Sequence, residues 1–250
     1  MCGAKGINVQ RNIDNKQMQE WAEQLSQDFL PDGWEHVTSS AFTRVAHHRE
    51  HRLYYKEFLP RSPMERAKAA LRGSRAARAR HNGDALLRAG FDAPQNLYWG
   101  VLTSGGEFLY CSESPGQGVG QWLLQHGDDV PRKRQLLDEL GIYIGRLHQS
   151  GFVHGALRPD NILAHWRGDR FTLTLLDNER NRRLQPAPGK ALLRNLMQLS
   201  MLRSTAITRT DRLRFFRSWR RQMRDLSAEE TLLLAREADL WARMRLQRRP

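Results

Sequence analysis

The spacing of apolar side chains divides the chain into a strand-rich first part and a mainly helical second part. Residues 16–29 place apolar side chains at helical intervals, which predicts an N-terminal helix. The segment 36–58 favours strands, most clearly at 52–58. Residues 96–101 and 107–112 predict a further pair of strands around a Ser-Gly-Gly turn.

Capping signals and periodicity predict the helices. Ser62-Pro63-Met64-Glu65 combines an N-cap serine, an early proline and a capping-box glutamate, and Ser74 is expected to start a second helix that ends near Arg88. After a flexible link at 114–118, residues 119–125 and 131–150 predict helices. A loop with a short apolar segment is expected at 152–165, then a strand at 171–176 and further helices.

This order of elements predicts an α+β protein with two lobes. Residues 1–33 are expected to form an N-terminal helical extension, residues 34–113 a small β-rich lobe, and residues 114–250 a mainly helical lobe. A chain of 250 residues can bury a substantial core in this form.

The chain is strongly basic, with a net charge of +13 and an isoelectric point of about 10.6. Residues 44–80 carry a net charge of +8 and residues 201–250 a net charge of +7, so the charge forms two clusters. Such clusters favour phosphorylated sugars, anionic membrane surfaces or nucleic acid as partners. Nucleic acid is the least favoured, because no zinc-finger spacing, RNP motif or basic zipper is present. A solvated surface without a specific partner is the alternative.

Cysteine usage and hydropathy indicate the compartment. Cys2 and Cys111 lie far apart in the sequence, which argues against a disulfide framework and favours a reducing compartment. Residues 1–10 lack the apolar run of a signal peptide, and no apolar stretch reaches the roughly 18 residues of a membrane span. We therefore expect a cytoplasmic protein, either soluble or held at a membrane surface by its charge.

Three segments carry candidate chemistry. Lys56 lies within the strand at 52–58 and can reach from a sheet towards a phosphate, although a solvent-facing lysine is the simpler reading of this residue alone. The second segment, His154 to Leu163, follows an amphipathic helix. The third is Asp177, directly after the strand at 171–176 and 16 residues beyond Asn161.

The second segment resembles the catalytic loop of protein kinases, whose pattern is His-x-Asp-Leu-x-x-x-x-Asn. The run Leu-His-x-x-Gly-x-x-His-Gly that ends at Gly155 strengthens this resemblance. The resemblance implies ATP and Mg²⁺ as cofactors, with Lys56 on the phosphates and Asn161 and Asp177 as oxygen ligands of the metal. Glu113, beside the link, is expected to contribute to nucleotide binding.

A closer resemblance is to the kinases of the lipopolysaccharide core, which phosphorylate Kdo or heptose. Residues 56–63 with 71–75, and the segment Asp177-Asn178-Glu179-Arg180, are similar to segments of that family. The resemblance covers roughly residues 37–202. It implies a two-lobed protein-kinase-like fold and ATP-dependent phosphorylation of an inner-core sugar, whose anionic, lipid-linked acceptor the basic clusters would attract. It also implies a cytoplasmic protein at the inner face of the bacterial inner membrane.

One departure from the kinase pattern concerns the catalytic base. Ala156 stands where kinases have the aspartate that accepts the proton of the attacking hydroxyl. Asp160 lies on the other side of Leu157 and is a poor substitute. The candidate catalytic residues are Arg158, which could contact the transferred phosphate, and His154, which is expected to orient the loop through hydrogen bonds.

A second departure concerns the partner of Lys56. Kinases pair this lysine with a glutamate on the following helix, but 74–88 contains only Asp84 as an acid, and Glu65 belongs to the earlier helix. No Gly-x-Gly-x-x-Gly precedes Lys56, and Ser39-Ser40-Ala41 is the candidate for backbone contacts to phosphate. Two functions stay open: a slow sugar kinase that relies on positioning and charge, or a pseudokinase that binds nucleotide or acts as a scaffold in cell-envelope biogenesis.

Overall fold

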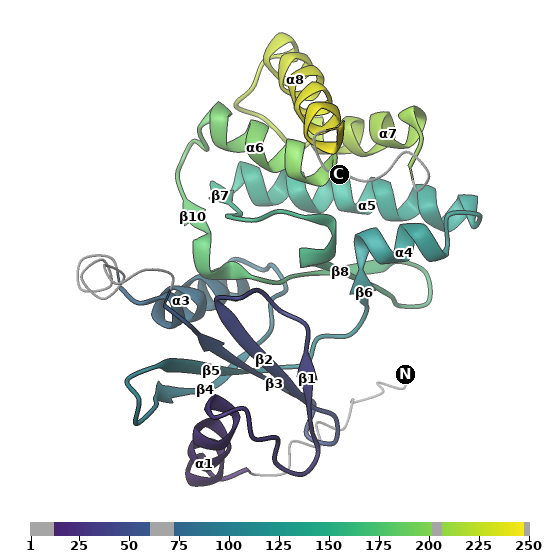
Figure 1. The fold of residues 1–250 in the computed structure, drawn as a ribbon. Helices are drawn as coiled ribbons and strands as arrows, with labels where there is room; N and C mark the ends of the chain where they lie inside the picture. Colours follow the sequence, from purple (N-terminus) through teal and green to yellow (C-terminus); the bar gives the residue numbers. More distant parts are fainter. Residues whose placement is uncertain (1–12, 61–72, 202–206, 248–250) are drawn as a thin grey trace, which may run out of the picture. The chain divides into compact units, whose positions relative to one another are not determined.

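The computed structural model describes residues 13–60, 73–201 and 207–247 (Figure 1). The chain divides into two compact units. The first takes its residues from 1–80 and 95–113, and the second takes its residues from 81–94 and 114–250. One division falls between Glu113 and Ser114, where the sequence places the boundary between lobes. The membership of 81–94 in the second unit is not a feature that the sequence predicts.

The first unit is built on a five-stranded antiparallel sheet with the order β1-β2-β3-β5-β4. The predicted strands at 52–58, 96–101 and 107–112 are confirmed, and the strand-rich segment 36–58 forms three strands. The central strand β3 pairs along its whole length with β2 and β5. The strands are β1 (Trp34–Val37), β2 (Thr43–His48), β3 (Leu53–Phe58), β4 (Asn96–Val101) and β5 (Glu107–Ser112).

The predicted N-terminal helix is confirmed as α1 (Asn15–Ser26), and it covers one face of this sheet (Figure 1). Asp14 caps the helix by accepting a hydrogen bond from the backbone N–H of Lys16. The buried face of α1 packs on aromatic side chains of the sheet, and the hydroxyl of Tyr110 donates to the carbonyl oxygen of Met18 at 3.0 Å. The helix falls within the same compact unit as the sheet.

The helix expected after Ser74 is confirmed as α3 (Arg75–Arg88). The hydroxyl of Ser74 accepts a hydrogen bond of 3.0 Å from the backbone N–H of Ala77, which is the predicted cap. The division between the two units falls within this helix, after Arg80. The helix start predicted at 62–65 lies outside the described residues.

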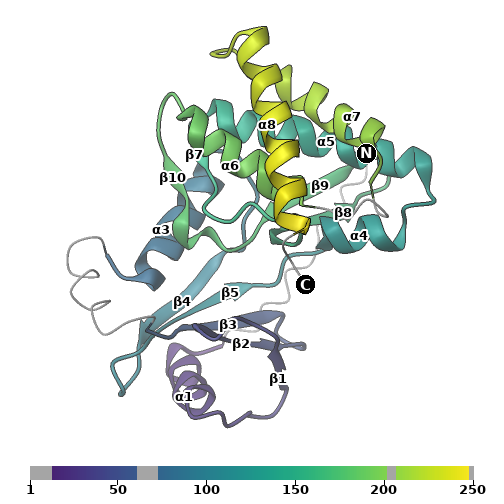
Figure 2. The same cartoon turned by 45° about the horizontal axis from the view of Figure 1, so that its top comes forward.

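The second unit is mainly helical, as predicted. In Figure 2, α8 packs along α6, and α7 packs along α5. Within the described residues, no helix has the length and apolar character that crossing a membrane would require. The helices are α4 (Val119–Gln125), α5 (Val130–Gln149), α6 (Gly189–Leu199), α7 (Arg209–Arg220) and α8 (Ala228–Gln247).

Short strands in the second unit correct one prediction. Residues 162–165, expected to lie in a loop, belong to β8 (Ile162–Trp166), which pairs with β9 (Phe171–Leu175) and with β6 (Gln117–Gly118). Five residues with imperfect alternation do not separate a strand from a loop, and the pairing with β9 stabilises this one. A second small sheet joins β7 (Phe152–Val153) to β10 (Arg182–Arg183).

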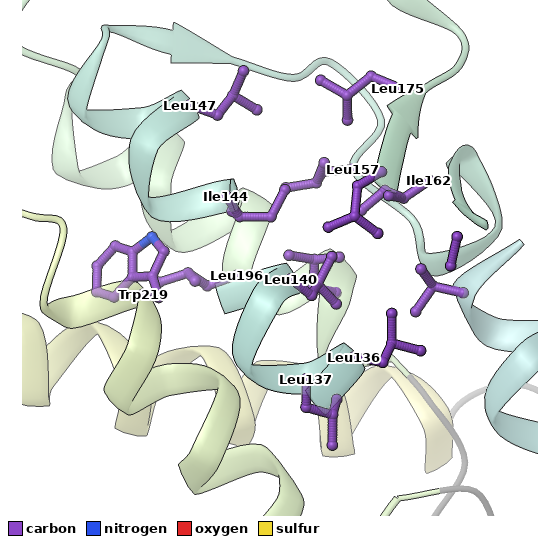
Figure 3. Close-up of a cluster of buried hydrophobic side chains, with 14 of the residues drawn as sticks. Leu136, Leu137, Leu140, Ile144, Leu147, Leu157, Ile162, Leu175, Leu196 and Trp219 are labelled. Atoms are coloured by element: carbon purple, nitrogen blue, oxygen red, sulfur yellow. The ribbon is translucent and has the colours of Figure 1, made fainter. Parts of the chain in front are cut away.

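The core of the second unit forms on the apolar face of α5 (Figure 3). Each fully buried Leu or Ile side chain contributes about 1.5–3 kcal/mol relative to exposure. Leu157 and Ile162 belong to this core, so it anchors the chain on both sides of residues 158–161. The facing residues are Leu136, Leu137, Leu140, Ile144 and Leu147 of α5, with Leu157, Ile162, Leu175, Leu196 and Trp219.

Two glycines allow α7 to approach the backbone of α5. A Cβ atom on Gly141 would lie 2.4 Å from the carbonyl oxygen of Phe215. A Cβ atom on Gly145 would lie 2.8 Å from the carbonyl oxygen of Trp219. Because neither position has room for a side chain, the spacing of the two helices depends on these glycines.

Candidate functional site

Lys56 lies on the central strand of the first unit. It pairs with Val45 of β2 and with Leu109 of β5. Its neighbours Tyr55 and Glu57 are buried, and strand alternation places them on the opposite face. The ammonium nitrogen of Lys56 lies 5.4 Å from the centre of the Phe58 ring, on the same face. The positive charge of Lys56 is therefore presented near the middle of the sheet, on the face that also carries Phe58.

The serine-rich turn between β1 and β2 is shaped by its own side chains. The hydroxyl of Ser39 donates to the carbonyl oxygen of Thr43 at 2.6 Å, and the hydroxyls of Ser40 and Thr43 lie 2.8 Å apart. The backbone N–H of Thr43 also donates to the carbonyl oxygen of Ser40. Since these hydroxyls are used within the turn, backbone N–H groups are its best candidates for contacts with phosphate.

Glu113 is the last residue of the first unit, and Arg52 holds it. The Nε atom of Arg52 donates to the Glu113 carboxylate at 2.7 Å, and the backbone N–H of Glu113 donates to the carbonyl oxygen of Arg52 at 2.8 Å. A contribution of Glu113 to nucleotide binding would therefore come from its backbone carbonyl oxygen.

In the second unit, the β8–β9 hairpin brings Asn161 and Asp177 to the same end. Asn161 directly precedes β8, and Asp177 lies two residues after the last residue of β9. Ile162 pairs with Leu175, and the backbone N–H of Leu176 donates to the carbonyl oxygen of Asn161 at 2.9 Å. Antiparallel pairing thus brings together the chain segments that carry Asn161 and Asp177, the two residues that the sequence predicts as metal ligands.

The backbone of Asp177 is left-handed, with φ of 60° and ψ of 46°. Residues other than glycine adopt this conformation infrequently, and such residues concentrate at functional sites. A 3₁₀ turn, Asn178–Arg180, follows directly. Glu179 is buried in this turn, and one of its carboxylate oxygens lies 3.5 Å from the Nε atom of Arg180.

The carbonyl oxygen of Ala156 holds the loop together. It accepts hydrogen bonds of 2.8 Å from the side-chain amide of Asn161 and from the backbone N–H of Arg158. Since the amide nitrogen of Asn161 donates to the loop, its Oδ1 atom is the one that could hold a cation. The side chain of Arg158 is exposed, whereas Leu157 beside it is completely buried.

Both ring nitrogens of His154 are engaged by the backbone. One, Nε2, lies 2.8 Å from the carbonyl oxygen of Leu176, and the other, Nδ1, accepts from the N–H of Ala156 at 3.1 Å. A carbonyl oxygen can only accept, so Nε2 carries the proton. Burial lowers the pKa of His154, although the hydrogen bond to Leu176 and the charge of Asp177 oppose this effect. His154 is therefore neutral and positions the loop against the segment before Asp177.

A buried network that the sequence did not predict holds His154 from the other side. The side chain of Asn195 on α6 donates to the carbonyl oxygen of His154 at 2.7 Å and accepts from its N–H at 3.0 Å. The same Oδ1 atom lies 3.1 Å from Nε2 of His148, whose Nδ1 accepts from the indole of Trp219 at 3.0 Å. Gln198 accepts from the backbone N–H of Leu157 at 3.0 Å. One feature of the sequence could have pointed to this role. Asn195 is a polar residue on the apolar face of α6, three residues after Leu192.

The segment after Asp177 is tied to the same loop by Asn181, whose Oδ1 atom accepts from the N–H of Gly155 at 3.3 Å and whose amide donates to Asn178 at 2.8 Å. A Cβ atom on Gly155 would lie 2.0 Å from the Cβ atom of Arg180, so only glycine fits there. The loop at 154–161 and the segment 177–181 are thus packed tightly against each other.

Asp160 lies against the start of α4. Its Oδ1 atom is 2.5 Å from the place that a Cβ atom on Gly120 would occupy, and 3.1 Å from the equivalent place on Gly118. This packing supports the prediction that Asp160 is a poor substitute for a base at position 156.

The arrangement offers two oxygen ligands for a cation. Among the described residues, no group of three or more His, Cys, Asp or Glu is placed to bind a metal. A magnesium ion held by Asn161 and Asp177 would complete its shell with water and phosphate oxygens, which is how Mg²⁺ is commonly bound beside nucleotides. The residues present therefore fit a magnesium–nucleotide complex better than a metal bound by protein alone.

Comparisons with known proteins identify the family and the fold of the chain. The model of the lipopolysaccharide kinase (Kdo/WaaP) family matches residues 21–219. A search of curated proteins found no match. A solved structure of WaaP in complex with acyl carrier protein is 19% identical, with a TM-score of 0.58 over 96% of this chain and 98% of that one.

Two further solved structures are similar. Aminoglycoside phosphotransferase APH(3'')-Id from Streptomyces rimosus is 17% identical, with a TM-score of 0.51 over 90% of this chain and 98% of that one. A crystal structure of WbdD is 18% identical, with a TM-score of 0.50 over 87% of this chain and 47% of that one. These likenesses concern the fold, and they confirm the predicted α+β, protein-kinase-like fold with a β-rich N-terminal lobe and a helical C-terminal lobe.

Proposed function

Because the chain belongs to the lipopolysaccharide kinase (Kdo/WaaP) family, we propose that it is an ATP-dependent phosphotransferase acting on a sugar of the lipopolysaccharide inner core. The observation that carries this proposal is the β8–β9 hairpin, which joins Asn161 to the left-handed Asp177. Two oxygen ligands at one end of a hairpin suit the metal ions that neutralise a triphosphate during transfer.

Lys56, Arg158 and His154 also have roles in this proposal. Lys56 would hold the phosphates of ATP, and the exposed Arg158 would stabilise charge on the transferred group. His154 would act as a positioning residue, because its ring nitrogens are engaged by the loop itself. Without a base at position 156, transfer would rely on orientation and charge neutralisation, and it would be slow.

Ala156 favours a second candidate function. A methyl group cannot accept a proton, so the chain could be a pseudokinase that binds nucleotide or acts as a scaffold in cell-envelope biogenesis. Both functions predict nucleotide binding through Lys56, Asn161 and Asp177. They differ in whether phosphate reaches an acceptor.

The basic character of the chain suits an anionic acceptor in either case. A net charge of +13 would attract a phosphorylated, lipid-linked sugar and would favour contact with the anionic inner face of the bacterial inner membrane. This part of the proposal predicts that association weakens as salt concentration rises, because exposed charges are screened within about 10 Å at 0.1 M salt.

Thermal unfolding with ATP, in the presence and absence of Mg²⁺, tests the nucleotide site. We expect ATP and Mg²⁺ together to raise the melting temperature of the natural protein, and Asp177→Asn to abolish the Mg²⁺-dependent part. Asparagine is the better replacement because it tolerates a φ of 60°. Asp169→Ala, at an exposed position between β8 and β9, is the matched control and should keep the full response.

Transfer of radiolabelled phosphate from ATP to purified lipopolysaccharide core then separates the two functions. Labelled core sugar would support the kinase, and its absence alongside a retained Mg²⁺-dependent response would favour the pseudokinase. A natural protein that shows no response to ATP and Mg²⁺ and no transfer would contradict both.

A further inference from the structure

A pocket in the helical second unit lies along α7, and three arginines line it. Its volume is about 320 Å³, and its lining includes Arg214, Arg217 and Arg221 together with Asp138, Thr210 and Ser218. Since the lining holds three cationic side chains and one carboxylate, its net charge is +2. Spacings of three and four residues place the arginines on one side of α7 and its C-cap.

Arg214 is held in place but not fully satisfied. Its Nη1 atom lies 3.4 Å from one oxygen of the Asp138 carboxylate, and the hydroxyl of Ser218 donates to the other oxygen at 2.8 Å. Its Nε atom is buried and has no hydrogen-bond partner within the described parts of the chain. A buried donor without an acceptor is destabilising, so the protein itself does not fully satisfy Arg214.

We propose that this pocket binds a phosphate group. Guanidinium groups bind phosphate through paired N–H donors, and these charge-assisted hydrogen bonds are stronger than neutral ones. The Asp138 carboxylate holds Arg214 and would repel an anion, so the ligand is placed against Arg217 and Arg221, whose side chains are exposed. Thr210, whose side chain carries a hydroxyl donor, also lines the pocket.

The phosphate could come from a lipid headgroup or from a soluble molecule. Thr210 and Leu213 also line an adjoining, mainly apolar pocket of about 640 Å³, and Leu213 is 64% exposed. A phosphate carried by a lipid would therefore find apolar surface beside it. The proposal concerns the phosphate, and the two sources are separated by experiment.

This pocket is separate from the candidate nucleotide site. None of its lining residues belongs to 154–161 or to 177–180. Asp138 precedes His148 by ten residues on α5, which corresponds to about 15 Å along the helix. Loss of phosphate binding here and loss of nucleotide binding at Asp177 can therefore be observed independently.

The test compares two double variants of equal charge. Arg217→Gln with Arg221→Gln removes two pocket arginines, and Arg220→Gln with Arg224→Gln removes two exposed arginines from the same region that do not line the pocket. Binding of inorganic phosphate is measured by calorimetry. Binding to vesicles of phosphatidylglycerol and phosphatidylcholine, with pure phosphatidylcholine as the neutral reference, is measured by co-sedimentation.

We expect the pocket double variant to lose about tenfold or more in affinity for phosphate, for the anionic vesicles or for both, which corresponds to about 1.4 kcal/mol. In the control double variant, the binding free energy should weaken by less than about half of that amount. Binding of phosphate alone would identify a soluble source, and binding of the vesicles alone would identify a lipid headgroup. Arg214→Gln should weaken the same binding while leaving the ATP- and Mg²⁺-dependent rise in melting temperature unchanged.

Equal losses in the two double variants would overturn the proposal, because binding would then depend on diffuse charge. Absence of binding to both probes by the natural protein would also overturn it. The melting temperature of each variant without ligand shows whether it is folded, and the exposed positions of Arg217 and Arg221 make a folding defect unexpected.

Discussion

The side-chain amide of Asn161 donates a hydrogen bond of 2.8 Å to the backbone carbonyl oxygen of Ala156. The candidate metal ligand is thus oriented by the main chain of the residue that lacks a catalytic side chain. A substitution at position 156 can change the chemistry of the loop while keeping this hydrogen bond.

Ala156→Asp is expected to raise the rate of phosphoryl transfer from ATP. A positioned general base typically contributes about 10²–10⁴-fold, and the loop already holds residue 156 between His154 and Asn161. The measurement is the initial rate of transfer to lipopolysaccharide core, with hydrolysis of ATP followed in parallel.

Ala156→Asn is the control, because it has nearly the shape of aspartate but no basic carboxylate. A gain in the aspartate variant that the asparagine variant does not share would assign the effect to proton transfer. Equal rates in the two variants would contradict a missing base as the limiting factor.

Asn195→Ala is expected to destabilise the protein by about 3 kcal/mol or more. Asn195 is completely buried, and its removal leaves the N–H and C=O groups of His154 and the Nε2 donor of His148 without their partner. Urea unfolding measures the loss. Arg194→Ala, at the exposed neighbouring position, should change the free energy of unfolding by less than about 0.5 kcal/mol.

The free energy of unfolding is expected to fall as the pH drops from 6.5 towards 4. Burial lowers the pKa of His148 to about 4, from 6.5 when exposed, and Nδ1 is already occupied as an acceptor for Trp219. Between these values the unfolded chain binds more protons than the folded chain, so acid favours unfolding, by about 3 kcal/mol at the lower end.

Urea unfolding at several pH values compares the natural protein with His148→Gln. The variant should show a smaller slope of unfolding free energy against pH in this window, whatever its absolute stability. The same slope in both proteins would mean that His148 is not the group responsible.

Gly141→Ala is expected to destabilise the protein by about 1–3 kcal/mol, although alanine is the better helix former. The new methyl group would lie 2.4 Å from the carbonyl oxygen of Phe215, so α5 and α7 would have to separate. Gly189→Ala at the start of α6 is the matched control, since nothing lies within 4 Å of its Cβ position. It should leave the unfolding temperature unchanged or raise it slightly, and a loss as large as that of Gly141→Ala would contradict the steric explanation.

The elements that sequence predicts best are those with long or strongly biased patterns. α5 has 20 residues with a continuous apolar face, and β3 combines aromatic residues with buried alternation, so local pattern and tertiary packing agree. β8 has five residues and is stabilised mainly by pairing with β9, which no local pattern reveals.

The candidate site divides in the same way. Lys56, Asn161 and Asp177 could be proposed as site residues because kinases place these residue types in this order along the chain. Asn195 could not, since it acts on the backbone of His154 across 41 residues of sequence. A single polar residue on an apolar helix face is the only local trace that such a contact leaves.

The shape of the loop at 154–161 is fixed mainly by residues that take no part in chemistry: Leu157 in the core, and Asn195 and Gln198 on α6. Architecture and reactivity can therefore change independently during evolution. A carboxylate could be introduced at position 156 without removing any of these contacts, so the scaffold of the loop does not itself fix which side chain stands there.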